Sequence, residues 1–243
     1  ILLERIIMRK NGRLADELRK VAIQKEYVKY AQGSALISLG NTKVICAAMV
    51  EERVPPFLRG VGEGWLTAEY SMLPYSSPNR ILREREQRRG RSYEIQRLIG
   101  RSLRAVVDLT ELGERTIWVD CDVVQADGGT RCACVTGAFV ALMGVDNWLR
   151  KKGIIEGSII GDFQAAISVG ISGGEKLLDL SFQEDSKASV DMNVVMTERG
   201  DLTEIQASGE GTSFSRNDFT ELLDLAAKGI EELIRLEKEV LEI

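Results

Sequence analysis

Two aspartates in the last third of the chain have the residue type and spacing for acid–base or metal chemistry. Asp185 and Asp191 stand on either side of the polar residues 186–189, between alternating apolar residues at 178–182 and at 190–194. We predict two strands joined by a hairpin turn, which would bring the two carboxylates together. Adjacent carboxylates raise each other's pKa or bind a divalent cation, usually Mg²⁺. Asp and Ser are also ordinary turn residues, so the segment by itself leaves both interpretations open.

A turn with two glycines is a second candidate, in this case for binding an anion. Residues 125–131 read QADGGTR and lie where a strand-like pattern changes to a helical one. Glycines let the backbone approach an anion, the first amides of the following helix point at it, and Arg131 adds a positive charge. The string matches neither the Walker loop nor the GxGxxG fingerprint, and Asp-Gly-Gly is also a common turn. An anion site and a plain turn therefore both remain open.

The third candidate is an arginine-rich segment, residues 80–104. It contains nine arginines, three glutamates and no lysine, so its net charge is +6 in a chain whose net charge is −5. Arginine is suited to two-point recognition of phosphate. Arg97, Arg101 and Arg104 recur at helical spacing, opposite an apolar face. The segment indicates a polyanionic partner, and the alternatives are a solvated helix face or a contact between subunits.

Composition narrows the chemistry further. The 243-residue chain has no histidine, which excludes Ser-His and Cys-His nucleophiles and His-bearing zinc or haem sites. Its 44% hydrophobic and 28% charged residues are typical of a globular protein. The four cysteines form no CxxC pair, so we expect reduced, buried thiols. The uncharged run at 132–145 is too short to span a bilayer, and no secretory cleavage site follows the first residues, so we expect a cytoplasmic protein without a membrane partner.

Hydrophobic periodicity places these candidates on an α+β fold. We predict two similar β/α halves, residues 8–153 and 154–243, packed as one compact unit. Ser215, with Asp218 three residues later, marks the start of the last helix. The other predicted elements are strands at 35–39, 43–50, 116–125 and 165–171, and a helix from 130 to a stop at 151–153.

Longer strings of the sequence together resemble the RNase PH family of exoribonucleases. The resemblance extends from Met8 to near the C-terminus and implies an RNase PH-like fold. It also implies a phosphate-dependent 3′→5′ exoribonuclease, a tRNA nucleotidyltransferase, that trims the 3′ end of precursor tRNA and releases nucleoside 5′-diphosphates. The strings that carry it are GRLADELR (12–19), GWLTAEYSMLP (64–74), GRSYEIQRLIGR (90–101), DCDVVQADGGTR (120–131) and EDSKASVDMNVV (184–195).

The resemblance gives the two aspartates a role. Asp185 and Asp191 would form the catalytic pair and would be the ligands of Mg²⁺. Asp185 would act as general acid or metal ligand, and Asp191 as its metal-binding or orienting partner. Phosphate as the attacking group needs little deprotonation near neutral pH, which is consistent with a site that has no histidine.

The resemblance also assigns the positive charges and the assembly. Inorganic phosphate, the co-substrate, would be bound by Arg91, Gly129, Thr130 and Arg131. The family forms a ring-shaped homohexamer, a trimer of dimers, so we expect the same assembly here, with RNA rather than DNA as its partner. The arginines expected to contact the RNA are Arg80, Arg83, Arg85, Arg97 and Arg101.

Some positions depart from the family pattern. Tyr75 follows the Met-Leu-Pro string, where family members often have an arginine, and Pro78 is also unexpected there. This departure concerns RNA contacts in that loop and not the phosphate site. Residues 206–210 differ from the sequence usual in the family, and residues 1–7 have no recognisable counterpart in it. The alternative functions are a catalytically silent RNA-binding ring subunit of an exosome-like complex and a hydrolytic nuclease. The retained aspartates and phosphate-binding arginines favour the phosphorolytic enzyme.

Overall fold

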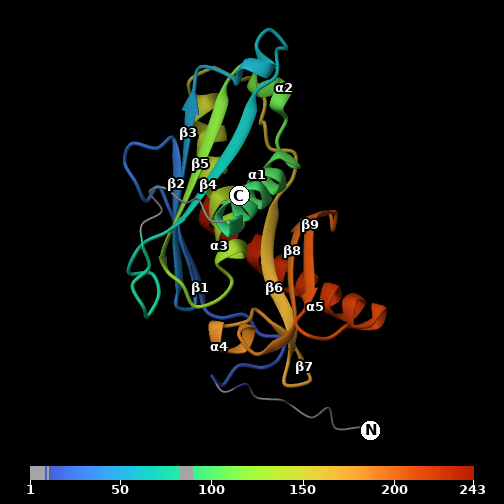
Figure 1. The fold of residues 1–243 in the computed structure, drawn as a ribbon. Helices are drawn as coiled ribbons and strands as arrows, with labels where there is room; N and C mark the ends of the chain where they lie inside the picture. Colours follow the sequence, from blue (N-terminus) through green and yellow to red (C-terminus); the bar gives the residue numbers. More distant parts are fainter. Residues whose placement is uncertain (1–8, 10, 83–89) are drawn as a thin grey trace.

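The computed structural model describes residues 9, 11–82 and 90–243, which form two β-sheets with helices packed against and between them (Figure 1). The first sheet has the strand order β1-β2-β3-β5-β4. Neighbouring strands pair antiparallel except β4 and β5, which are parallel. Its strands are β1 (Val21–Lys25), β2 (Gly33–Leu39), β3 (Thr42–Glu51), β4 (Trp65–Met72) and β5 (Thr116–Gln125).

The second sheet is antiparallel and has the order β7-β6-β8-β9. Its strands are β6 (Gln164–Ser172), β7 (Glu175–Leu178), β8 (Ala188–Thr197) and β9 (Leu202–Gly209). The helices are η1 (Pro56–Leu58, a 3₁₀ turn), α1 (Gly90–Arg104), α2 (Leu109–Leu112), α3 (Thr130–Lys151), α4 (Phe182–Asp185) and α5 (Arg216–Leu241).

Helix α3 lies at the centre of the molecule. It contacts β2 and β3 of the first sheet and β6 of the second, while α1 contacts both β4 and β9 and α5 covers β6. Apolar residues surround α3 on all sides, as in a fully buried helix, and Phe139 in its middle is fully buried. Ala166 of β6 and Val195 of β8 belong to the same buried cluster as the first sheet. The predicted α+β fold of two halves in one compact unit is therefore confirmed, and the boundary at residue 153 stays a prediction.

The apolar character of α3 also bears on the expected absence of a membrane partner. Among the residues described, α3 is long and apolar enough to cross a bilayer. However, 78% of its most apolar window is buried inside the protein, which is typical of a core helix. Gly33 of β2 allows this close packing, because a Cβ there would lie 1.8 Å from the carbonyl oxygen of Ala141 in α3.

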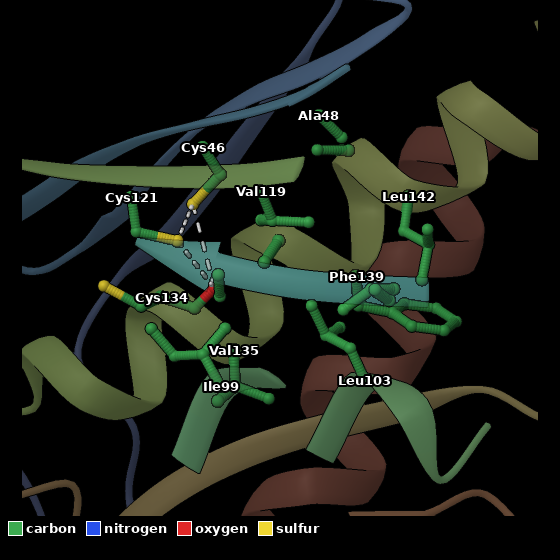
Figure 2. Close-up of a cluster of buried hydrophobic side chains, with 14 of the residues drawn as sticks. Cys46, Ala48, Ile99, Leu103, Val119, Cys121, Cys134, Val135, Phe139 and Leu142 are labelled. Atoms are coloured by element: carbon green, nitrogen blue, oxygen red, sulfur yellow. Dashed lines mark hydrogen bonds between the residues drawn. The ribbon is translucent and has the colours of Figure 1, made fainter. Parts of the chain in front are cut away.

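All four cysteines are buried and unbridged, as predicted. Cys46 of β3 and Cys121 of β5 are cross-strand neighbours whose sulfur atoms lie 3.8 Å apart (Figure 2). Both thiols also approach the carbonyl oxygen of Cys134 in α3, at 3.7 and 3.9 Å. The cysteines therefore act as small apolar residues where α3 packs on the first sheet.

The segment before Asp185 differs from its prediction. We expected a strand at 178–182 and a hairpin turn at 186–189, but β7 ends at Leu178, Phe182 begins α4, and β6 separates β7 from β8. Asp179 ends the strand because its backbone takes the left-handed conformation, with φ of 54°. Ser181 then begins the helix through a capping box with Glu184. In the sequence, the alternating residues Leu178, Leu180 and Phe182 do not distinguish this turn and short helix from a strand.

Candidate active site

A cleft between the two sheets brings the predicted site residues together. It consists of two adjoining cavities of about 830 and 340 Å³ that share Arg91, Arg131, Asp185 and Asp191 among their lining residues. Gly129 and Thr130 line the smaller cavity. The structure therefore gathers all six predicted catalytic and phosphate-binding residues around one cleft, from α1, the start of α3, α4 and β8.

The turn with two glycines forms one wall of this cleft. Gly128 and Gly129 both take positive φ angles, of 81° and 68°, and Gly129 is the N-cap residue of α3. A Cβ on Gly128 would lie 2.6 Å from the carbonyl oxygen of Leu180, so the turn packs directly on the chain that enters α4. The hydroxyl of Thr130 shares a hydrogen bond of 3.3 Å with the hydroxyl of Tyr70. These contacts hold the N-terminal amides of α3 in place beside the cleft, as an anion site requires.

The two aspartates reach the cleft from α4 and β8. Burial and the neighbouring Asp185 raise the pKa of Asp191 to about 6. Burial also raises the pKa of Asp185, although Arg131 and Arg91 oppose the shift. The predicted proximity of the carboxylates is thus confirmed, but α4 and the start of β8 produce it instead of a hairpin. Such a pair can share a proton or bind a cation.

Asn193, which the sequence analysis did not single out, orients Asp191. Its side-chain nitrogen donates to Oδ2 of Asp191 at 3.3 Å, and its oxygen accepts from the thiol of Cys132 at 3.3 Å. Burial raises the pKa of Cys132, so the thiol keeps its proton and can donate. The signal in the sequence was the spacing of two residues from Asp191 along β8, which puts both side chains on one face of the sheet.

The sequence analysis also did not identify Glu94 and Gln206, which fix the position of Arg131. Nη2 of Arg131 lies 3.2 Å from Oε2 of Glu94, and Nε2 of Gln206 donates to Oε1 of Glu94 at 2.8 Å. Burial opposes ionisation of Glu94, but the hydrogen bond from Gln206 and the charge of Arg131 outweigh it and lower its pKa. These three residues come from α1, α3 and β9, so no local pattern could have brought them together.

The predicted RNA-binding arginines lie outside the cleft as far as the structure describes them. Arg80 and Arg97 are exposed, and Arg101 forms a two-point ion pair with Glu204 of β9, at 2.6 and 3.1 Å. None of these three lines either cavity. Arg83 and Arg85 lie outside the described residues.

The donor set of the cleft fits a cation that retains much of its water. Within residues 9, 11–82 and 90–243, no group of three or more Cys, Asp or Glu side chains is arranged to hold a metal ion. Mg²⁺ commonly takes one or two carboxylates together with water and substrate phosphates. The raised pKa of Asp191 shows that negative charge is costly in this position, so a cation would stabilise the ionised pair.

Comparison with known proteins agrees with this geometry. Residues 17–146 match domain 1 and residues 162–229 match domain 2 of the 3′ exoribonuclease family. Ribonuclease PH of Moorella thermoacetica is 57% identical over 237 residues, which are 97% of this chain and 95% of that protein. Ribonuclease PH of Bacillus subtilis is 58% identical over 237 residues, 96% of this chain and 97% of that protein.

Solved structures show the same fold. The Archaeoglobus fulgidus exosome with RNA bound to the active site contains a chain that is 25% identical, with a TM-score of 0.76 over 96% of this chain and 91% of that chain. Rice Rrp46 is 17% identical, with a TM-score of 0.77 over 95% of this chain and 98% of that chain, and shows the fold alone. The resemblance found in the sequence is confirmed, and the chain belongs to the 3′ exoribonuclease family.

Proposed function

We propose that the cleft removes nucleotides from the 3′ end of RNA by phosphorolysis. The chain is a phosphate-dependent 3′ exoribonuclease that processes tRNA, as its relatives named Ribonuclease PH support. The observation that carries the proposal is the placement of Arg91, Arg131 and the amide end of α3 in one cleft with Asp185 and Asp191. Positive groups and carboxylates facing one space suit a reaction between two phosphates.

The attacking phosphate and the RNA phosphodiester are both negatively charged and repel each other. The positive side of the cleft reduces this repulsion. Arg91 and Arg131, with the backbone of Gly129 and Thr130, bind the inorganic phosphate. A phosphate oxygen forms a bond to the last phosphorus of the RNA, and the bond from that phosphorus to the 3′ oxygen of the preceding nucleotide breaks. The products are a nucleoside 5′-diphosphate and an RNA one nucleotide shorter.

The carboxylate side serves the leaving 3′ oxygen. Asp185 donates a proton to that oxygen or would be a ligand of the cation. Asp191 is its partner, which orients Asp185 or would bind the same cation. When bound by these two residues, Mg²⁺ would stabilise the negative charge that develops on the displaced oxygen. Phosphate is already ionised near neutral pH, so the attacking group does not need a histidine base.

The assembly and the RNA surface complete the proposal. The positive charges of five arginines guide the RNA to the cleft, and these are Arg80, Arg83, Arg85, Arg97 and Arg101. The chain forms a homohexamer, a trimer of dimers, in the cytoplasm, with halves at residues 8–153 and 154–243 and with no DNA or membrane partner. The similarity to chains of exosome assemblies supports the ring, and the burial of α3 supports a protein without a membrane partner. Sedimentation that found a stable, fully active monomer would contradict the ring.

Product analysis tests the proposal. The purified protein is incubated with a short RNA and Mg²⁺, with and without inorganic phosphate. We expect release of nucleoside 5′-diphosphates only when phosphate is present. Nucleoside monophosphates in both reactions would instead show a hydrolytic nuclease. Binding of RNA without turnover would show the silent ring subunit of an exosome-like complex.

A further inference from the structure

Three arginines near the start of the chain meet two acidic residues behind the cleft. Arg9, Arg13 and Arg19 are at most 8% exposed, and Asp179 is fully buried. We call these three arginines together with Asp179 and Glu184 the arginine clamp. None of its five members lines the two cavities of the cleft. Their contacts nevertheless reach both the turn with two glycines and the helix that carries Asp185.

Arg19 holds the turn with two glycines from behind. Its Nη1 donates to the carbonyl oxygen of Asp127 at 2.5 Å, and its Nη2 donates to that of Gly128 at 3.3 Å. A Cβ on Gly129 would lie 3.0 Å from the same Nη2. In a trans peptide the C=O and N–H point in opposite directions, so the N–H groups of Gly128 and Gly129 point away from Arg19. The guanidinium therefore sets the orientation of these two amides.

Asp179 fixes Arg19 in turn. Its carboxylate accepts from the backbone nitrogen, Nε and Nη2 of Arg19, at 2.8, 2.9 and 2.6 Å, and from Nη1 of Arg13 at 3.3 Å. The backbone of Asp179 is left-handed, with φ of 54°. Such strain persists where the surrounding contacts hold it, and it concentrates at functional sites. The carbonyl oxygen of Asp127 also accepts from the backbone nitrogen of Phe182, which joins the turn to α4.

Arg9 acts on α4 through Glu184, the residue directly before Asp185. Nε and Nη2 of Arg9 donate to the Glu184 carboxylate at 2.7 and 2.5 Å, while Nη1 donates to the carbonyl oxygen of Leu178 at 2.6 Å. Glu184 also accepts from the backbone nitrogen and hydroxyl of Ser181, at 2.9 and 2.8 Å. Burial opposes ionisation of Glu184, but the bonds from Arg9 and Ser181 outweigh it and lower its pKa to about 2. The short helix is thus held at both of its ends.

We propose that Arg19 and Arg9 are positioning residues for phosphorolysis. Arg19 holds the backbone amides of the turn toward the phosphate, and Arg9, through Glu184, holds Asp185 toward Asp191. The inference rests on the function proposed above and deepens it. It divides the clamp into two arms with different kinetic effects, because one arm supports phosphate binding and the other supports the carboxylate that acts on the leaving oxygen.

Two conservative variants test the two arms separately. Arg19→Lys keeps the charge opposite Asp179 but cannot reach both carbonyl oxygens, so we expect the KM for phosphate to rise about tenfold with the KM for RNA unchanged. Glu184→Gln keeps the length of the side chain but loses its charge toward Arg9, so we expect kcat to fall about tenfold with the KM for phosphate unchanged. Calorimetric titration with inorganic phosphate gives a readout of the first arm that does not need turnover.

Arg150→Lys is the matched control. Nε of Arg150 donates to the buried carboxylate of Asp146 at 2.9 Å, and neither residue lines the cleft. We expect this variant to keep both KM values and kcat. If Arg19→Lys and Glu184→Gln match the control in kinetics and phosphate affinity, or change kcat and KM alike, the inference is wrong. If Arg19→Lys does not fold, Asp179→Asn decides, because asparagine tolerates the left-handed backbone and should give the same rise in phosphate KM.

The proposed function and the role of the clamp can fail separately. If the unchanged protein releases no nucleoside diphosphate with phosphate present, the proposed function fails before any variant is made. If the unchanged protein is active and the phosphate affinity of Arg19→Lys equals that of Arg150→Lys, only the inference about the clamp fails.

Discussion

At the scale of single residues, Asp185 and Asp191 lie half-buried in the same cleft, and this placement sets their chemistry. Partial burial raises the pKa of both groups, and the carboxylate of Asp185 raises the pKa of Asp191 further. Arg131 and Arg91 partly compensate Asp185, whereas Asp191 depends on Arg131 and the amide of Asn193. The pair is therefore suited to hold a proton or a cation at the point where the leaving oxygen needs one.

Asp185→Asn should abolish turnover while leaving RNA binding largely intact. The amide keeps the shape of the side chain but can neither donate a carboxylic proton nor bind a cation well, so we expect kcat to fall by at least about 100-fold. Gel retardation should show an unchanged Kd for RNA. Asp224→Asn, at an exposed position of α5, is the control and should be fully active. A near-normal rate in Asp185→Asn would show that the assigned role is wrong.

Asp191→Asn should stabilise the metal-free protein above pH 6. The pKa of Asp191 is about 6 in the folded protein against an ordinary value of 3.8, so stability is lost as the pH rises from about 4 to 6. The asparagine variant lacks this loss, and we expect a gain of about 3 kcal/mol in the free energy of unfolding at pH 7. Urea denaturation in a chelator at pH 3.5 and pH 7 measures it. Equal differences between the two proteins at both pH values would contradict the raised pKa as the cause.

At the scale of elements, the strands and helices with regular patterns were predictable. The hairpin of β2 and β3, strand β5, helix α3 and the capped start of α5 each follow from periodicity and turn residues within their own sequence. The segment between β7 and β8 was not predictable, because Asp179 takes its conformation from Arg13 and Arg19, far away in the sequence. Glu94 and Gln206 were missed for the same reason, because they contact residues that are far away in the sequence. Asp185 and Asp191 were found because they are close together in the sequence.

Gly128→Ala tests the close approach of the turn to α4. The substitution meets both a positive φ of 81° and a carbonyl oxygen 2.6 Å from the new Cβ. Gly174→Ala is the matched control, since Gly174 has φ of 85° and open space around it. Both should lose about 1 kcal/mol from backbone strain, and Gly128→Ala should lose more. Only Gly128→Ala should also raise the KM for phosphate, and equal effects of the two variants in unfolding and kinetics would contradict this packing.

At the scale of the whole molecule, charge is distributed unevenly. The chain carries −5 in total, yet the arginine-rich segment carries +6, so the remainder is strongly acidic. An acidic protein can bind RNA when its positive charge is concentrated where the strand enters. Part of this segment, Arg101, is engaged with Glu204, whereas Arg80 and Arg97 are exposed. The exposed arginines are therefore the ones expected to contribute to the salt dependence of RNA binding.

Arg80→Ala and Arg97→Ala should each weaken RNA binding in a salt-dependent way. An arginine that contacts one phosphate of a single strand contributes about 0.7 to the slope of log K against log salt, so each variant should lower the slope by about that amount. The value of kcat at saturating RNA should not change. Arg235→Ala, an exposed position on α5, should leave the slope as it is. A slope unaffected by either substitution would remove that arginine from the RNA surface.

The origin of the second phosphate in the product tests the central claim most directly. The protein is incubated with RNA, Mg²⁺ and inorganic phosphate that carries ³²P, and the released nucleotides are separated. Phosphorolysis predicts nucleoside diphosphates with the label in the β-phosphate, one label for each nucleotide released. Unlabelled nucleoside monophosphates would contradict the account, because water rather than phosphate would then have attacked the RNA.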